Sequence, residues 1–439
     1  MIIDSVTLAR LQFGATASFH IIFPSLILGL ALYLTVMEAR WLQTRNNIYR
    51  DQYQFWIKPF ISVFLVGVVT GIVLSYQLDT NFGGLYRKTE AILMPIREIE
   101  FLNAVVLEAG CFGIMAWGWR RVGDKLHFVA TLAVTVGVTI SSVCILMRNS
   151  WMQTPAGASM VGGELTLNDR MATLFSPSFP YRFSHVVGGA CLCTSFFVLG
   201  ISAWYLLQRR HQSFAKYSFR AALAVISVVA PLQIISGDLH GLNTLEYQPS
   251  KIAAIEGIWE TARGVPMVLF AIPDQAQERN RHAVEIPVLA SLILKHDPGG
   301  EIRGMKEFPR ADRPNMPLVF YSFRIMAGTG VLMLVLPMIW HLLLRRRLSA
   351  GNRWFLWCCC AMLPSGFVAT IAGWCVAEAG RQPWAIFGLA RTVDIFDAMP
   401  AAHVDRSLLY IGLAYVIISA LFIAFLRRII KRGPYVSGL

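Results

Sequence analysis

The sequence has little charge: only 15% of its 439 residues are Asp, Glu, Lys or Arg, whereas 55% are hydrophobic and the mean hydropathy is +0.53. Soluble domains carry about 25% charged residues, so this deficit argues against a water-soluble protein and indicates a lipid environment. The chain also lacks a continuous basic face, because its Lys and Arg residues stand in short clusters between apolar runs despite the net charge of +13. We therefore expect no nucleic-acid-binding surface.

Three further features are absent. No Cys-x-x-Cys-His motif occurs, which excludes a covalently attached haem, and the eight cysteines fall in apolar runs where we expect them to be reduced and buried. The acidic Asp4 precedes the first basic residue, which argues against a cleavable signal peptide. No repeat relates the two halves, which disfavours a transporter built from duplicated units.

What is present is a series of apolar runs that are long enough to cross a bilayer, which takes about 20 residues each. The sequence therefore predicts an all-α membrane protein, a bundle of nine transmembrane helices. The sixth expected span is the shortest and weakest. The expected spans are 15–37, 55–77, 98–119, 126–147, 183–207, 218–236, 318–344, 354–377 and 407–426.

The charge of the loops predicts the orientation. Basic residues predominate after the third, fifth and seventh spans and in the tail, whereas the 237–317 segment holds nine Lys or Arg against eleven Asp or Glu. Basic short loops stay in the cytoplasm, so we expect the N-terminus outside and the C-terminus inside. The chain then divides into spans 1 to 6 (1–236), an external loop (237–317) and spans 7 to 9 (318–439). The basic clusters are Arg120, Arg121 and Lys125; Arg209, Arg210 and Lys216; Arg345, Arg346, Arg347 and Arg353; and Arg427, Arg428, Lys431 and Arg432.

Ionisable side chains at membrane depth are costly, and few occur here. The predicted topology places all of them except Glu108 in the outer half of the bundle or at its edge. Glu108 lies about 12 Å further in along its helix. This distribution indicates a cofactor cluster near the outer face and a polar route leading inward. The residues are His20, Glu100, Glu108, His185, Arg324 and Glu378, with Met326 beside Arg324.

Taken singly, these residues have plainer explanations. A lone histidine in a span more often bonds a neighbouring helix than an iron atom, and a lone methionine is usually packing. We assign no role to His127 and expect the histidines near loops, including His240, to be solvated. A proton-coupled transporter remains open, as does a membrane b-type cytochrome, although that class usually pairs histidines on facing helices.

Short motifs are more specific. Gly373-Trp374, Glu378 and the block Gly-Arg-Gln-Pro-Trp at 380–384 resemble the GWxxxExGRQPW signature of cytochrome bd oxidase subunit I. Other segments resemble the same family in the same order, so the resemblance covers essentially the whole chain, and the short external loop is similar to the cyanide-insensitive branch. These segments are Leu11-Gln12-Phe13 with His20, Asn149–Gln153, Phe183-Ser184-His185 and Phe323–Met326.

The resemblance implies a terminal quinol oxidase with three haems: a low-spin haem b, a high-spin haem b, and a haem d or a b-type replacement. His185 and Met326 match the axial ligands of the low-spin haem, and Arg324 is suited to a haem propionate. His20 and Glu378 match the ligands of the two high-spin haems where dioxygen is reduced, in an order that we do not assign. The signature block adds three cofactor-binding residues. They are Arg381, Gln382 and Trp384.

The same resemblance implies roles for two pairs of residues. Glu100 and Glu108 match an acidic pair that serves the oxygen site, as proton donors or as a weak or alternative iron contact. Lys251 and Glu256 match the family's Q-loop motif, in which Glu256 would accept a proton from ubiquinol or menaquinol and Lys251 would hold a quinol oxygen. Without the resemblance, a solvated surface pair would be preferred. Quinol oxidation outside and proton uptake from the cytoplasm would make the reaction electrogenic without a pump.

The resemblance also implies a multi-pass protein of the bacterial inner membrane. Its partners would be a second membrane subunit (subunit II), with or without a small accessory single-span subunit, and membrane lipids. The sequence departs from the family in having Arg97 and Glu98 beside Glu100, Cys144 where Trp is common, and Arg148 where a small residue is usual. These departures predict an altered haem environment, through a salt bridge or a shifted pKa.

Overall fold

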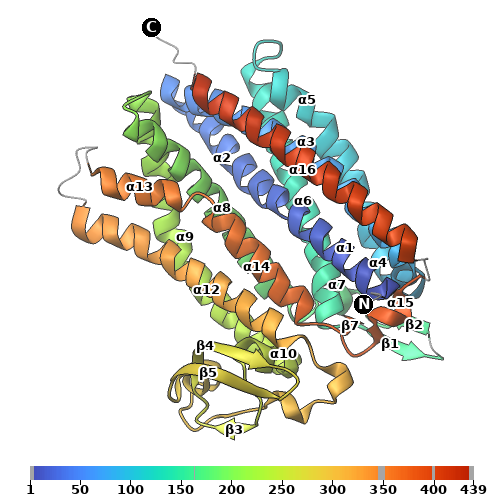
Figure 1. Cartoon of the computed structure of the whole chain (residues 1–439). Helices are drawn as coiled ribbons and strands as arrows, with labels where there is room; N and C mark the ends of the chain where they lie inside the picture. Colours follow the sequence, from blue (N-terminus) through green and yellow to red (C-terminus); the bar gives the residue numbers. More distant parts are fainter. Residues whose placement is uncertain (1–3, 163, 345–351, 398–400, 435–439) are drawn as a thin grey trace.

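The computed structural model describes residues 4–162, 164–344, 352–397 and 401–434. Within these ranges, nine helical segments are long and apolar enough to cross a membrane, as predicted. They form a bundle with the N-terminus and the 248–315 segment at one end, here called the loop end, and the C-terminus at the other (Figure 1). The basic residues Arg345, Arg346 and Arg347 lie outside the described residues. The nine segments are Ser5–Thr44, Asn47–Asn81, Gly83–Trp117, Asp124–Gln153, Arg170–Leu207, Gln212–Tyr247, Arg310–Leu342, Arg353–Ala379 and Val404–Arg432.

Three spans consist of more than one helical piece. The first is interrupted at Ile21, the third contains a π-helical segment, and the eighth is interrupted by a turn with Pro364, a residue that cannot donate a backbone hydrogen bond. The pieces are α1 (Ser5–His20) and α2 (Ile22–Thr44); α4 (Gly83–Asn103), the π-helical segment (Ala104–Ala109) and α5 (Gly110–Trp117); and α13 (Arg353–Ala361) and α14 (Ser365–Ala379).

The six other spans consist mainly of one long helix each. The sixth, expected to be short, continues to Tyr247, because the polar residues after 236 find partners at the loop end; Asn243, for example, donates to the carbonyl of Pro177. The ninth span is the exposed α16. These helices are α3 (Asn47–Asn81), α6 (Asp124–Gln153), α8 (Phe179–Leu207), α9 (Gln212–Tyr247), α12 (Met316–Ile339) and α16 (Ala401–Arg432).

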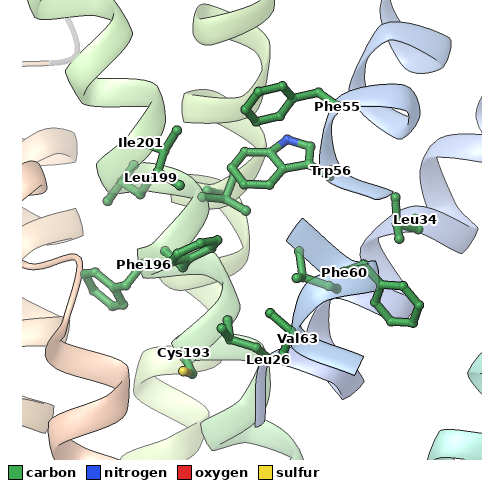
Figure 2. Packing of buried hydrophobic residues seen from close by; sticks show 14 of the residues in the cluster. Leu26, Leu34, Phe55, Trp56, Phe60, Val63, Cys193, Phe196, Leu199 and Ile201 are labelled. Atoms are coloured by element: carbon green, nitrogen blue, oxygen red, sulfur yellow. The ribbon is translucent and has the colours of Figure 1, made fainter. Parts of the chain in front are cut away.

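The core lies where α2, α3 and α8 meet (Figure 2). Trp56 and Phe60 of α3 and Phe196 of α8 are fully buried there. Lipid is as apolar as this core, so close packing rather than exclusion of water holds the helices together. Small residues permit that packing: a Cβ on Gly29 of α2 would overlap Thr194 of α8.

The loop end carries a small folded unit between α9 and α12. Its helix α10 (Pro249–Glu256) packs on α9 and α12, and β4 (Met267–Asp274) pairs antiparallel with β5 (Arg279–Ile286). Ile252, Trp259 and Val319 share one apolar cluster, which anchors the unit to the bundle. The remaining short elements are β1 (Ala158–Val161) with β2 (Glu164–Leu167), β3 (Ala262–Arg263) with β6 (Glu301–Ile302), β7 (Trp384–Ile386) with β8 (Ala390–Arg391), and the helices α7 (Arg170–Leu174), α11 (Leu289–Lys295) and α15 (Thr392–Ile395).

The eight cysteines are all free, as expected. The expectation that each of them is buried is wrong for Cys358. It belongs to α13 at the edge of the bundle, where Trp354 and Trp357 are exposed as well.

Candidate active site

Glu378, near the end of α14, is the centre of a dense polar cluster. Its Oε1 accepts hydrogen bonds from Asn149 Nδ2 (2.9 Å) and Gln153 Nε2 (3.1 Å), and its Oε2 accepts one from Arg381 Nη2 (2.5 Å). Asn149 in turn accepts from Arg182 Nη1 at 3.0 Å. Side chains of α6 and of the turn after α14 therefore bond to a single carboxylate, and Arg182 of α8 joins them through Asn149.

Positive charge exceeds negative charge around Glu378. Arg182 is 6% exposed and Arg381 is 7% exposed, and among the described residues Arg182 Nε and Arg381 Nε and Nη1 are buried without a hydrogen-bond partner. Two buried arginines against one carboxylate are costly unless further anionic groups complete the site. The two propionate carboxylates of a haem have the required charge, so these residues fit that cofactor.

Lys251 of α10 belongs to the same cluster. It is 2% exposed, and its Nζ donates to Gln153 Oε1 at 2.6 Å. Burial lowers the pKa of Lys251 well below its usual value; Arg182 adds to this effect and Glu378 opposes it.

Glu256 faces different partners. Its carboxylate accepts from Arg324 Nη2 at 3.3 Å, and Arg324 also donates to the carbonyls of Ile255 and Val268 and lies 4.1 Å from the Phe320 ring centroid. Burial raises the pKa of Glu256, and Arg324 opposes that rise. Arg324 thus donates hydrogen bonds to the small folded unit between α9 and α12. Its contact with a haem propionate stays a prediction.

Lys251 and Glu256 are not a solvated surface pair, since they are 2% and 6% exposed. Five residues of α-helix separate two side chains by about 140° around the axis. The helical segment therefore directs Lys251 toward Gln153 and Glu256 toward Arg324.

His185 and Met326 lie on α8 and α12, near the loop end. Gln233 Nε2 lies 3.2 Å from His185 Nδ1, which leaves the other ring nitrogen for a metal ion. A Cβ on Gly237 would lie 3.2 Å from His185 Cε1, and a Cβ on Gly373 would lie 2.9 Å from Met326 Sδ. Both side chains thus contact a glycine of a neighbouring helix. The missing glycine side chains leave room beside His185 and Met326, which ligands of a large planar group such as haem require.

His20 has similar surroundings but lies apart from the Glu378 cluster. Its Nδ1 lies 2.8 Å from Thr70 Oγ1 of α3, and a Cβ on Gly71 would lie 3.3 Å from its Cε1. The outer hydrogen bond is typical of a metal-bound histidine. The expectation for His240 was wrong: it is half-buried in α9, with its ring centroid 5.9 Å from that of His185.

Glu100 lies in α4, just before the π-helical segment of the third span, and Glu108 lies within that segment. Eight residues of α-helix would place them about 80° apart around the axis. The π-helical segment turns less per residue, and both acids face α6. Glu108 accepts from Ser141 Oγ at 2.6 Å and Asn103 Nδ2 at 3.3 Å, whereas Glu100 forms an ion pair with Arg148.

The departures from the family pattern have distinct effects. Arg148 forms a salt bridge to Glu100, with 11% of its side chain exposed. Arg97 pairs instead with Asp79 at 3.0 Å and stacks over Tyr86 at 4.7 Å. Cys144, one turn before Arg148 on α6, is buried.

Of the other two predicted residues of the signature block, Gln382 lies in the turn before β7 and Trp384 begins β7. Gln382 Oε1 accepts from Thr392 Oγ1 at 2.8 Å, and the Arg391 guanidinium lies 5.0 Å from the Trp384 ring centroid. These contacts with Thr392 and Arg391 fix the segment that follows Arg381, and neither side chain contacts the Glu378 carboxylate in the part of the chain that the structure describes.

Sequence reasoning missed Arg182 and gave Asn149 and Gln153 no role beyond the motif. The spacing of Asn149 and Gln153, one helical turn apart, is the signal that could have found them. It also missed a buried pair in the other half of the bundle, where Glu38 Oε1 lies 2.6 Å from His127 Nδ1. Glu38 follows the expected end of the first span directly, so it resembled an interfacial residue.

Comparison with known proteins decides the family. The model described as cytochrome bd terminal oxidase subunit I matches residues 8–434. This chain belongs to that family. It is 32% identical to cytochrome bd ubiquinol oxidase subunit 1 of Bacillus subtilis (strain 168), covering 98% of this chain and 94% of that protein. It is 29% identical to cytochrome bd-II ubiquinol oxidase subunit 1 of Escherichia coli (strain K12), covering 98% and 97%.

A solved structure of bd oxidase from Geobacillus thermodenitrificans has a similar fold, with a TM-score of 0.90, 27% identity, and coverage of 98% of this chain and 99% of that chain. As a cytochrome bd subunit I, the chain is a haem-containing, multi-pass subunit of a terminal quinol oxidase, an oxidoreductase of respiratory electron transport. Family membership selects this function over the transporter and the electron-transfer cytochrome. The numbering of the relatives as subunit 1 implies a second subunit.

Proposed function

We propose that this chain holds three haems in the loop-end half of its bundle: a low-spin haem b, a high-spin haem b, and a haem d or a b-type replacement. The observation that carries the proposal is the positive excess of Arg182 and Arg381 around Glu378, with buried N–H groups that lack a partner among the described residues. When bound, haem supplies reversible one-electron chemistry and, at an iron with an open axial position, a site for dioxygen.

Four side chains would hold the three iron atoms. His185 and Met326 would together hold the iron of one haem, which would then transfer electrons without binding oxygen. His20 and Glu378 would each provide one ligand to a high-spin haem. The bonds from Thr70 to His20 and from Asn149 to Glu378 would fix the orientation of those ligands.

We place quinol oxidation at the loop end, around Glu256. Two quinol molecules release four electrons and four protons, which balances the reduction of one dioxygen to two waters. Burial raises the pKa of Glu256 toward the range in which a carboxylate serves as a proton acceptor, and Arg324 holds the carboxylate in place. Ubiquinol and menaquinol both fit this chemistry.

We propose that the loop end is periplasmic and the C-terminus cytoplasmic, in a bacterial inner membrane, because basic clusters gather at the C-terminal end. The parts 1–236, 237–317 and 318–439 would then be the first helix group, the external quinol-binding loop and the second helix group. Subunit II, lipids and any accessory single-span subunit would contact the exposed apolar faces.

The protons consumed would come from the cytoplasm, with Glu108 and Glu100 at the outer end of their route. Glu108, bonded to Ser141 and Asn103, can hold a proton there, whereas Glu100 is paired with Arg148. Protons that enter from the cytoplasm and are consumed near the periplasm carry charge across most of the membrane. The reaction would therefore be electrogenic without a pump.

A reduced-minus-oxidised visible spectrum of the purified protein, with and without carbon monoxide, tests the proposal. We expect a low-spin b-type band and a separate high-spin signal that responds to carbon monoxide. His20→Ala and Glu378→Gln should each abolish oxygen reduction and leave the low-spin band intact. A spectrum without a response to carbon monoxide, or normal turnover of both variants, would contradict the site assignment.

A further inference from the structure

The β4–β5 hairpin of the small folded unit exposes an apolar surface. Its register pairs Phe270 with Val284 and Met267 with Ile286, and cross-strand partners lie on the same face of a hairpin. Phe270 is 52% exposed and Val284 is 55% exposed. Glu285 alternates with Val284 and Ile286 and therefore stands on the opposite face of β5. Further exposed side chains of β4, and of α11, which packs on β4, complete this apolar edge; its members are Leu269, Phe270, Val284, Ile286, Leu292 and Ile293.

Two irregularities in the strand pairing produce this surface. The register shifts between Val268 and Phe270 and again between Phe270 and Ile272. In a regular strand, Phe270 would share the face of the buried Val268, because successive side chains alternate. The shifts instead expose Leu269 and Phe270 together, whereas Val268 and Ala271 remain buried. The strand therefore presents two consecutive large apolar side chains at the surface of the protein.

Hydrogen bonds to α12 fix the position of β4 along the membrane span (Figure 1). The side chain of Gln275, in the hairpin turn, accepts from the first backbone N–H of α12 at 3.2 Å. Further along the helix, the Tyr321 hydroxyl donates to the Ala271 carbonyl at 3.0 Å. Arg324 Nε donates to the Val268 carbonyl at 3.1 Å, and Arg324 lies about 12 Å beyond the start of α12. β4 thus runs antiparallel to α12, with its turn at the helix start and its apolar residues deeper along the span.

The polarity of the surroundings changes in the same direction. The hairpin turn is charged and forms the ion pair between Glu278 and Arg313 at 2.8 Å. In contrast, α12 has no charged residue before Arg324, and it exposes Leu318 and Ile325 on its surface. The apolar edge therefore lies level with the exposed apolar part of α12, and the charged turn lies level with its start.

We propose that the apolar edge enters the bilayer interface beside α12 and contacts phospholipid acyl chains, so that this part of the loop unit is embedded rather than solvated. An apolar surface that continues the lipid-facing side of a span, below a charged turn, is what an interfacial segment requires. Arg324 donates both to the Val268 carbonyl and to Glu256. The edge would thus bring lipid close to the place where a lipid-dissolved quinol reacts, a consequence that rests on the proposed function of Glu256.

Photo-cross-linking tests this in the complete oxidase, reconstituted in vesicles of phosphatidylethanolamine and phosphatidylglycerol. Phe270 and Val284 are replaced, one at a time, by the photoreactive residue p-benzoylphenylalanine, and the adducts are identified by mass spectrometry. The probe reacts only with C–H groups that it touches, so both positions should form phospholipid adducts. The yield should exceed that of a solvated position by about tenfold, since burial of a side chain of this size strongly favours contact with lipid.

Gln277 is the matched control, because it is exposed in the charged turn of the same hairpin. If the hairpin variants fail to assemble, Leu292 of α11 offers a second position on the same edge. Adducts of Phe270 and Val284 with a protein chain instead of lipid, no phospholipid adduct at either position, or an equal yield at Gln277 would overturn the proposal. The assay reads neither haem nor quinol oxidation, so its failure would leave the proposed function standing, and loss of the role of Glu256 would leave the adducts unchanged.

Discussion

Replacement of Gly373 by alanine should weaken the proposed bond between Met326 and a haem iron without changing the ligand itself. The new Cβ would lie 2.9 Å from Met326 Sδ, whereas ordinary non-bonded contacts are about 3.5 Å or longer, so the sulfur must move by about 0.6 Å. Overpacking of this kind costs about 1–3 kcal/mol. If that cost falls on the iron–sulfur bond, the ligation equilibrium constant drops by about 5- to 150-fold.

The assay is the reduced visible spectrum of Gly373→Ala with and without carbon monoxide. We expect the low-spin band to decrease and carbon monoxide binding to increase, as in Met326→Leu, because the sixth position of that iron becomes open. Gly328→Ala is the matched control: it lies two residues after Met326 on α12, and a Cβ there meets no atom within 4 Å. A wild-type low-spin spectrum in Gly373→Ala, or an equal loss in Gly328→Ala, would refute the reasoning.

Three further predictions follow from buried charges. Burial raises the pKa of Glu256 and Arg324 opposes that rise, so Arg324→Gln should raise the pKa further and move the acidic limb of the pH profile of kcat/KM for quinol to higher pH. Glu256→Gln should remove this limb. A limb that does not move in Arg324→Gln would contradict the role of Glu256. Arg148→Ala leaves Glu100 without its ion-pair partner and should lower the free energy of unfolding in detergent by about 3 kcal/mol. Replacement of both residues should lower it by less than the sum of the two single replacements, and additive losses would contradict the pairing. Glu38→Ala should cost about 3–5 kcal/mol by thermal unfolding and Glu38→Gln less, since the amide keeps an acceptor; equal stability of the two variants would argue against a buried pair.

The sequence alone was sufficient for the architecture. Lipid requires each span to satisfy its own backbone hydrogen bonds, so apolar runs of sufficient length must be helices. Nine were predicted, and nine are found in the part of the chain that the structure describes. The limits of the spans were less certain. The helix that ends at Tyr247 continues past the apolar run, because polar side chains such as Asn243 find partners outside the core.

The candidate ligands His20, His185, Met326 and Glu378 were named from motifs whose chemistry and order resemble one family, and their role as ligands stays a prediction. What surrounds them could not be predicted in this way. The departure at Arg148 could be noticed in the sequence, but only the packing of α6 on the third span shows that it pairs with Glu100. No short-range pattern relates residues that meet across separate helices.

The clearest contrast is between Lys251 and Glu256. As sequence, they are two charged residues five positions apart in one motif, and a shared quinol site was the natural prediction. The tertiary structure turns them to different partners, Gln153 and Arg324. The rotation of about 140° between the two side chains is a local property of the helix. Their partners depend on where α6 ends and α12 begins, and on the space that Gly380 leaves for the Lys251 side chain. Local sequence determines which chemical groups are available, whereas long-range packing decides which of them meet.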